Sequence, residues 1–210
     1  DRPHQNSTFN MPAVLLAMRA PILAILGISF AAHSLVYQSL LQFIPLFTQT
    51  TSGFSIVWAT GIGALFCLFN CAGNILSGHL LQAGFRPHLI PKYGGLIVGG
   101  LLLLLCIFGT EKWVVIVVLL LTGLASGGTP PVLFYIVSQQ KTKLENMPVF
   151  VAWMFQIQGL GMLTGPALIG LIVDHSENWN YGFLSLIPFC FLISFAARFL
   201  RQNASPAPGH

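Results

Sequence analysis

Polar side chains recur along several long apolar stretches of this chain, and they are the residues best suited to do chemistry. In residues 21–47, small and polar residues recur at steps of three or four, which places them on one sector of a helix. The sector consists of Gly27, Ala31, Ser34, Gln38, Gln42, Pro45 and Gln49. Amides and hydroxyls form hydrogen bonds without carrying charge. They serve either a solute or a neighbouring helix, and the sequence leaves both uses open.

Three other apolar stretches carry a similar sector at the same helical steps. Its members are Gly63, Cys67, Asn70, Asn74 and Ser77 in residues 54–81, Thr122, Ser126 and Thr129 in residues 113–137, and Gln158, Gly161 and Gly165 in residues 147–173. Four sectors of this kind would together form one polar surface in contact with water, which favours a polar cavity or solute path. The candidates to line a substrate cavity are Tyr37, Gln38, Gln42, Ser126 and Thr129.

His33 is the titratable residue nearest to these candidates, and Tyr37 follows it one helical turn later. Because imidazole titrates near neutral pH, His33 is a candidate proton relay. A structural histidine with satisfied nitrogens is the alternative. None of the apolar stretches has Asp, Glu, Lys or Arg at its middle. The charged residue that usually marks a proton pathway inside a membrane is therefore missing from this chain.

Ser126 could in principle be the nucleophile of an intramembrane serine protease, because Gly127 follows it. Leu124, however, occupies the position two residues before it, and residues 181–199 contain no histidine. A serine hydroxyl without a base to accept its proton is a weak nucleophile. We therefore expect a protein that is not an enzyme.

The cysteines offer little metal or redox chemistry. Cys67 and Cys71 are four residues apart, but no His, Asp or Glu at nearby spacing completes a ligand set. Disulfide frameworks belong to small exposed domains. We therefore expect no metal, no cofactor and four reduced, packed thiols at Cys67, Cys71, Cys106 and Cys190.

Composition identifies the elements that must position these residues. Charged residues make up 7% of the 210 residues, whereas soluble domains carry roughly 25%. A membrane-spanning helix needs roughly 20 apolar residues. Six stretches qualify, at residues 21–47, 54–81, 91–109, 113–137, 147–173 and 181–199. We expect an all-α polytopic membrane protein with six transmembrane helices, and no room for an extramembrane catalytic or nucleic-acid-binding domain.

The basic residues predict its orientation. All except Lys112 fall in the first segment, the second and fourth connections, and the tail: Arg2, Arg19, Arg86, Lys92, Lys141, Lys143, Arg198 and Arg201. Basic segments stay in the cytoplasm. We therefore expect a cytoplasmic arm or inter-half linker at residues 1–20, a bundle at residues 21–199 and a cytoplasmic tail at residues 200–210. A bacterial inner membrane is the expected location, and the glycosylation patterns at Asn6 and Asn203 are attributed to chance.

Four segments resemble motifs of the major facilitator superfamily. Residues 73–87, GNILSGHLLQAGFRP, resemble the loop after its second or eighth helix, with Leu81 or Gln82 where the strict form has an acidic residue. Residues 127–131, GGTPP, are similar to its tenth helix. Residues 156–170, QIQGLGMLTGPALIG, and the WNYGF at residues 179–183 look like its eleventh helix and the start of its twelfth. The order of the motifs indicates the carboxy-terminal half, helices seven to twelve.

This resemblance implies alternating access, in which two six-helix bundles rock around a site at the membrane midplane. The first and fourth helices of the half would line the cavity, and the second and fifth would form the seam with the amino-terminal six-helix half. The seam and gating candidates are Asn70, Asn74, Gly78, Gly84, Arg86, Gln158, Gly161, Gly165 and Pro166. The expected partners are the lipid bilayer, a small-molecule substrate and that other half.

The implied activity is secondary active transport. Amides among apolar and aromatic residues fit a neutral or amphipathic organic solute, and proton-coupled efflux is the expected direction. A half-size or truncated protein that acts as a partner or scaffold, inactive alone, is the alternative.

A short internal pattern agrees with the resemblance. Asn70-x-x-Gly73 in the second stretch returns as Gln158-x-x-Gly161 in the fifth, and a Leu-Ser-Gly or Leu-Thr-Gly follows each, with one residue of slippage. Each half of these transporters consists of two inverted three-helix repeats. The second and fifth helices should therefore correspond.

Overall fold

The structure is a computed structural model that describes residues 21–139 and 147–200. The predicted arm at residues 1–20, the predicted tail apart from Leu200, and the two lysines of the fourth connection, Lys141 and Lys143, lie outside these residues. Within them the chain is helical. The helices are α2 (Pro21–Thr50), α3 (Ile56–Gln82), α4 (Leu89–Phe108), α5 (Lys112–Gly127), α6 (Thr129–Ser138), α7 (Met147–Ser176) and α8 (Trp179–Leu200).

These helices form six spans that are long and apolar enough to cross a membrane, which confirms the predicted number and class. The largest boundary differences lie at the carboxyl ends of α2 and α7. In α2, the hydroxyls of Thr48 and Thr50 donate to the carbonyl oxygens of Ile44 and Leu46, at 2.8 and 2.9 Å. Because these polar residues bond back to their own helix, α2 continues beyond the residue where hydropathy alone would end it.

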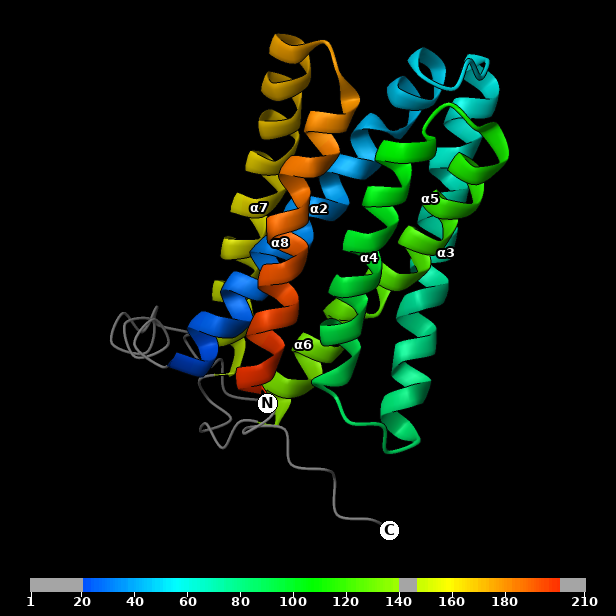
Figure 1. Ribbon diagram of the computed structural model, residues 1–210. Helices are drawn as coiled ribbons and strands as arrows, with labels where there is room; N and C mark the ends of the chain where they lie inside the picture. Colours follow the sequence, from blue (N-terminus) through cyan, green and yellow to red (C-terminus); the bar gives the residue numbers. More distant parts are fainter. Residues whose placement is uncertain (1–20, 140–146, 201–210) are drawn as a thin grey trace, which may run out of the picture.

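The fourth span runs from Lys112 to Ser138, in agreement with the predicted stretch at residues 113–137, but it is not one unbroken helix. It is divided into α5 and α6 at Gly128. Pro130 and Pro131 follow and form the first turn of α6. Proline has no amide hydrogen and its ring crowds the preceding turn. The α5 ladder therefore ends before these residues, and α6 starts again in the same general direction (Figure 1).

The helices pair in a pattern that relates the two halves of the chain. The most extensive contacts join α2 to α7, α3 to α5 and α4 to α8. A Cβ added at Gly73 of α3 would collide with the carbonyl oxygen of Leu124 in α5, and one added at Gly161 of α7 would collide with that of Ala31 in α2. The two glycines of the internal pattern thus make equivalent contacts, each between the second helix of one three-helix repeat and the first helix of the other, where a small residue permits close packing.

The two ends of the bundle differ in charge. At one end the connections after α2, α4 and α7 meet: Ser52 donates to the Gly109 carbonyl oxygen at 2.7 Å, and the Trp179 indole donates to Thr50 at 3.0 Å. The described acidic residues Glu111, Asp174 and Glu177 belong to this end. The opposite end holds the turn between α3 and α4, the start of α2 and the end of α8 (Figure 1). Its described cations are Arg86, Lys92 and Arg198.

Candidate functional site

Two glutamine side chains on α2, Gln38 and Gln42, form what we call the glutamine face. Gln38 is half-buried and Gln42 is exposed. Neither amide makes a hydrogen bond to another residue in the part of the chain that the structure describes. An amide that faces lipid without a partner is costly, because the hydrocarbon offers no donor or acceptor. The glutamine face therefore requires water, a solute or another protein surface over it.

The predicted polar sector of α2 divides into two parts with different surroundings. Its first part packs inside the six-helix bundle: a Cβ at Gly27 would lie 2.5 Å from the Trp153 ring, and the Ala31 carbonyl lies against Gly161. Its later part, from Gln38 onward, reaches the surface. Interhelical packing thus explains the first residues of the sector and does not explain the glutamines.

Tyr37 connects the glutamine face to α3. Its hydroxyl lies 3.9 Å from the Cys67 sulfur, and its ring stacks on Phe66 with centroids 5.5 Å apart. On the other side it stacks on His33, at 6.2 Å and an interplanar angle of 8°. Three neighbours hold this ring, so its orientation is fixed beside Gln38.

Asn70 joins α3 to α5 below this tyrosine. Its amide nitrogen donates to the Ser126 hydroxyl oxygen at 3.0 Å and to the Gly123 carbonyl oxygen at 3.3 Å. Asn74 in turn donates to the Asn70 carbonyl and side-chain oxygens, at 2.9 and 3.2 Å. The predicted polar sector of α3 is therefore a hydrogen-bonded interhelical contact.

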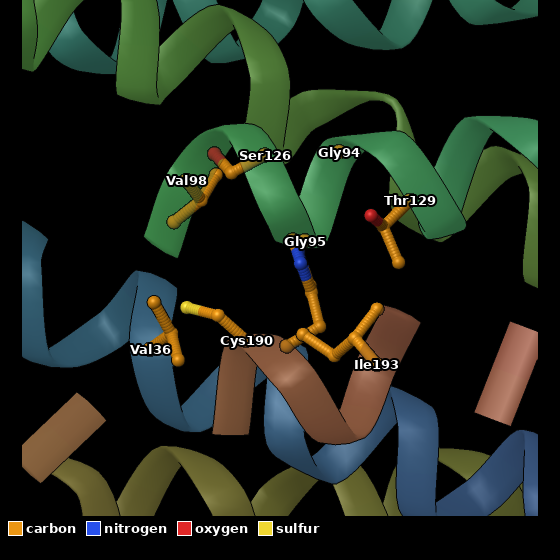
Figure 2. Close-up of a pocket in the computed structure, with 9 residues that line it drawn as sticks. Val36, Gly94, Gly95, Val98, Ser126, Thr129, Cys190 and Ile193 are labelled. Atoms are coloured by element: carbon orange, nitrogen blue, oxygen red, sulfur yellow. The ribbon is translucent and has the colours of Figure 1, made fainter. Parts of the chain in front are cut away.

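His33, Ser126 and Thr129 meet in a small cavity at the centre of the unit, which we call the axial cavity. It measures about 10 Å³, and its lining residues are His33, Val36, Gly94, Gly95, Val98, Ser126, Thr129, Cys190 and Ile193. Figure 2 shows Val36, Cys190 and Ile193 facing Val98, Ser126 and Thr129 across this space. A volume of this size holds about one water molecule.

The axial cavity lies where the two repeats meet. His33 and Val36 follow Ala31 by two and five residues, as Ser126 and Thr129 follow Leu124. Since Ala31 and Leu124 are equivalent by their glycine contacts, these four lining residues form two equivalent pairs. Ser126 and Thr129 are 4% and 2% exposed. Both therefore face this internal cavity and not the surface that carries Gln42.

The surroundings of Ser126 in this cavity bear on whether it could be the nucleophile of an intramembrane serine protease. His33 lies on the cavity with Ser126, so a histidine is present that the sequence alone did not place there. The Ser126 hydroxyl, however, donates to the Gly123 carbonyl oxygen at 2.9 Å and accepts from Asn70. No hydrogen bond joins it to His33 among the described residues, so the geometry lacks an activated nucleophile.

The predicted seam residues have different surroundings. Gly161 and Gly165 of α7 are buried against the backbone of α2 inside the unit, so close helix packing accounts for both. Gln158 and Pro166 are half-buried on the same helix, and Arg86 is exposed. Gly78 has open space around it.

Gly84 ends helix α3. It has φ +81°, the left-handed conformation that glycine adopts without strain. The amide of Phe85 donates to the Leu80 carbonyl oxygen at 2.9 Å, and that of Gly84 to Leu81 at 3.1 Å, which together are a Schellman motif. This motif fixes the backbone that carries Phe85 and Arg86 in the turn between α3 and α4.

Sequence reasoning missed the contributions of α4 and α8 to the axial cavity. These helices carry few amides or hydroxyls, so no polar sector marked them. The adjacent glycines Gly94 and Gly95 were the available signal: a Cβ at Gly95 would lie 2.5 Å from the Cys190 carbonyl oxygen, so α4 and α8 are in backbone contact there. No group of three or more metal-ligating side chains occurs among residues 21–139 and 147–200.

Replacing Asn70 by leucine is expected to destabilise the protein by about 1–2 kcal/mol, because Ser126 and Gly123 lose a donor within the membrane. A double-mutant cycle of Asn70→Leu with Ser126→Ala, read by thermal unfolding in detergent, should give a coupling of about 0.6 kcal/mol or more. Thr122→Val is the control for a hydroxyl that bonds only to its own helix, at the Val118 carbonyl. Additive effects at Asn70 and Ser126 would contradict the bond.

Comparisons with known proteins agree with this geometry. Residues 3–145 match the Major Facilitator Superfamily, so the chain belongs to this superfamily of membrane transporters. A solved structure described as an auto inhibited POT family peptide transporter superposes with a TM-score of 0.76 at 18% sequence identity. The match covers 89% of this chain and 38% of that one, so the chain spans well under half of that transporter's length. A search of curated proteins finds no match.

Proposed function

We propose that this chain is the carboxy-terminal half of a secondary active transporter that moves a small neutral or amphipathic organic solute by alternating access. The observation that carries the proposal is the glutamine face: two amides on a membrane-spanning helix lack partners among the described residues and reach the surface. A cavity between two halves would supply water and solute to them. Aromatic and apolar neighbours such as Tyr37 suit an organic solute more than an ion.

In this proposal Tyr37, Gln38 and Gln42 contact the solute directly. Ser126 and Thr129 are reached only when the repeats move apart at the axial cavity, since both are buried in the present arrangement. His33 is the proton-relay candidate, because it is the titratable group next to both regions. The ionised groups among the described residues lie near helix ends, so a coupling carboxylate would come from the other half.

The exposed faces of α3 and α7 support a missing partner. In an apolar stretch of 18 residues in each of these helices only 28% and 17% of residues are buried, against 61% for α2. In the proposed arrangement the amino-terminal six-helix half covers these faces. A half-size protein that serves as a scaffold is the second candidate, since the chain covers only 38% of the similar structure.

Transport by reconstituted protein tests the function. The chain is placed in proteoliposomes alone and together with the amino-terminal half, and movement of the dyes Nile red and rhodamine 6G is followed with and without a proton gradient. Gradient-driven movement that requires both halves supports the proposal. Movement by the chain alone would contradict the need for a second half, and failure of every combination would contradict this solute class.

The proposed orientation places the Arg86 end in the cytoplasm, in a membrane such as the bacterial inner membrane. In intact cells a membrane-impermeant maleimide should label Thr110→Cys at once and Ala83→Cys only after permeabilisation, because the two exposed positions lie at opposite ends of the bundle. The unsubstituted chain controls for its four natural thiols. Labelling of Ala83→Cys from outside would reverse the orientation.

A further inference from the structure

An apolar groove lies between α3, α4 and α5, away from the glutamine face. Its volume is about 420 Å³. Leu76 and Leu80 come from α3, Ile97 and Leu101 from α4, and Leu121 from α5. We propose that this groove, the acyl groove, binds one acyl chain of an anionic phospholipid whose phosphate contacts Arg86 and Lys92.

The lining of the groove fits a hydrocarbon chain and not a polar solute. Its polar side chains are Ser77 and Tyr93, and the Ser77 hydroxyl already donates to the Asn74 carbonyl oxygen at 2.8 Å. Solute sites combine apolar walls with a few convergent polar groups. Here only Tyr93, which is 51% exposed at the mouth, is available to bond a ligand.

The length of the groove matches one leaflet of a bilayer. It follows α4 from Leu89 to Leu101, a distance of about 18 Å at 1.5 Å per residue. The hydrocarbon core of a bilayer is roughly 30 Å thick, so each leaflet contributes about half of that. An acyl chain that starts at the helix end therefore finishes near the membrane midplane, where the groove also ends.

The mouth of the groove has the charge that a phosphate requires. The Lys92 ammonium lies over the Tyr93 ring, 5.1 Å from its centroid, and that ring lines the groove. Arg86 is exposed and directly follows Phe85, another lining residue, in the turn that the Schellman motif fixes. The described acidic residues all belong to the opposite end of the bundle. Basic residues beside a groove between helices bind anionic headgroups.

Native mass spectrometry of the purified full chain with added dioleoylphosphatidylglycerol tests the proposal, with dioleoylphosphatidylcholine as the zwitterionic probe. One tightly retained phosphatidylglycerol is expected, and little phosphatidylcholine. Arg86→Gln and Lys92→Gln should each weaken retention roughly five-fold, since a basic residue near the membrane surface contributes about 1 kcal/mol and 1.4 kcal/mol is ten-fold. Lys112→Gln, at the opposite end, is the matched control and should change nothing.

A second pair of variants tests the groove itself. Leu76→Trp should fill it and weaken phosphatidylglycerol retention several-fold, whereas Leu68→Trp on the same helix should not, because Leu68 is exposed outside the groove. Both positions are on the surface, so both variants should elute from gel filtration like the parent chain. Equal retention of the two lipids, equal loss in the control variants, or displacement by millimolar inorganic phosphate would each overturn the proposal.

Discussion

Replacing Gly161 by leucine is expected to prevent assembly of this six-helix unit. Gly161 lies against the backbone of α2, and a Cβ there would collide with the Ala31 carbonyl oxygen. Backbone cannot move aside as a flexible side chain does, so the α2–α7 contact must separate along its length. We expect a loss of at least about 3 kcal/mol of stability, the upper end of what overpacking costs. The measurement is gel filtration and thermal unfolding in detergent.

Gly159→Leu is the matched control for this substitution. Gly159 is on the same helix and exposed, with open space around the added side chain. Both changes favour the helix by roughly 0.5–1 kcal/mol through intrinsic propensity, so propensity cannot account for a difference in stability between the two variants. A Gly161→Leu protein that elutes and melts like Gly159→Leu would show that the close α2–α7 contact does not exist.

Loss of transport is the second large effect, expected when Gln38 and Gln42 are both replaced by leucine. In the proposed site each amide gives the solute hydrogen bonds that leucine cannot make. A neutral hydrogen bond contributes about 0.5–1.5 kcal/mol. Two together, about 1–3 kcal/mol, therefore lower kcat/KM for dye transport roughly five- to 140-fold. The assay uses the same proteoliposomes as the functional test, containing both halves.

Gln49→Leu provides the control within the same helix. The Gln49 amide donates to the carbonyl oxygen of Pro45 at 3.0 Å, so its hydrogen bond belongs to the helix end and not to a solute. Its transport rate should stay within about two-fold of the parent. If the double variant folds, as gel filtration would show, and still transports at the parent rate, the glutamine face is not the solute site.

The two effects depend on successive parts of one face of helix α2. The α7 side of α2 is closed by backbone contact, with Ala31 against Gly161 and Leu35 against Gly165. The later part of the helix leaves Gln38 and Gln42 without partners among the described residues. Helix α2 therefore packs against the other repeat in the first part of this face and presents a candidate solute surface in the later part. This division explains how one polar sector contains both small packing residues, such as Gly27 and Ala31, and the unpaired amides of Gln38 and Gln42.

The equivalent helix of the second repeat, α5, is arranged differently. Its polar residue Ser126 is bonded to Asn70 and faces the axial cavity, opposite His33. Two equivalent positions thus carry a titratable ring in one repeat and a hydroxyl in the other. The repeats share backbone packing but differ in side-chain chemistry, which is what allows an asymmetric site to form on a symmetric frame.

The sequence by itself determined the spans, the class and the family. Length and apolarity are local properties, and a bilayer admits few structures besides helices of about 20 residues. The paired motif of Asn70 and Gly73 with Gln158 and Gly161 also indicated the repeat. Pro130 and Pro131 indicate the interruption of the helix at Gly128. Hydropathy is averaged over a long stretch of residues, so it does not detect a break caused by two of them.

The tertiary structure alone decided which polar residues face inward. A helical sector gives the relative direction of its members but not the rotation of the helix against its neighbours. Ser126 and His33 are far apart in the chain, and only the packing of α2, α4, α5 and α8 places both on one cavity. The acyl groove is likewise a space between three helices, defined by small residues such as Gly94 and Ala125 that carry no signal alone. The spans and their polar sectors follow from the local sequence, because they depend on neighbouring residues of one helix. The axial cavity and the acyl groove depend on contacts between residues that are distant in the chain, so only the packed structure reveals them.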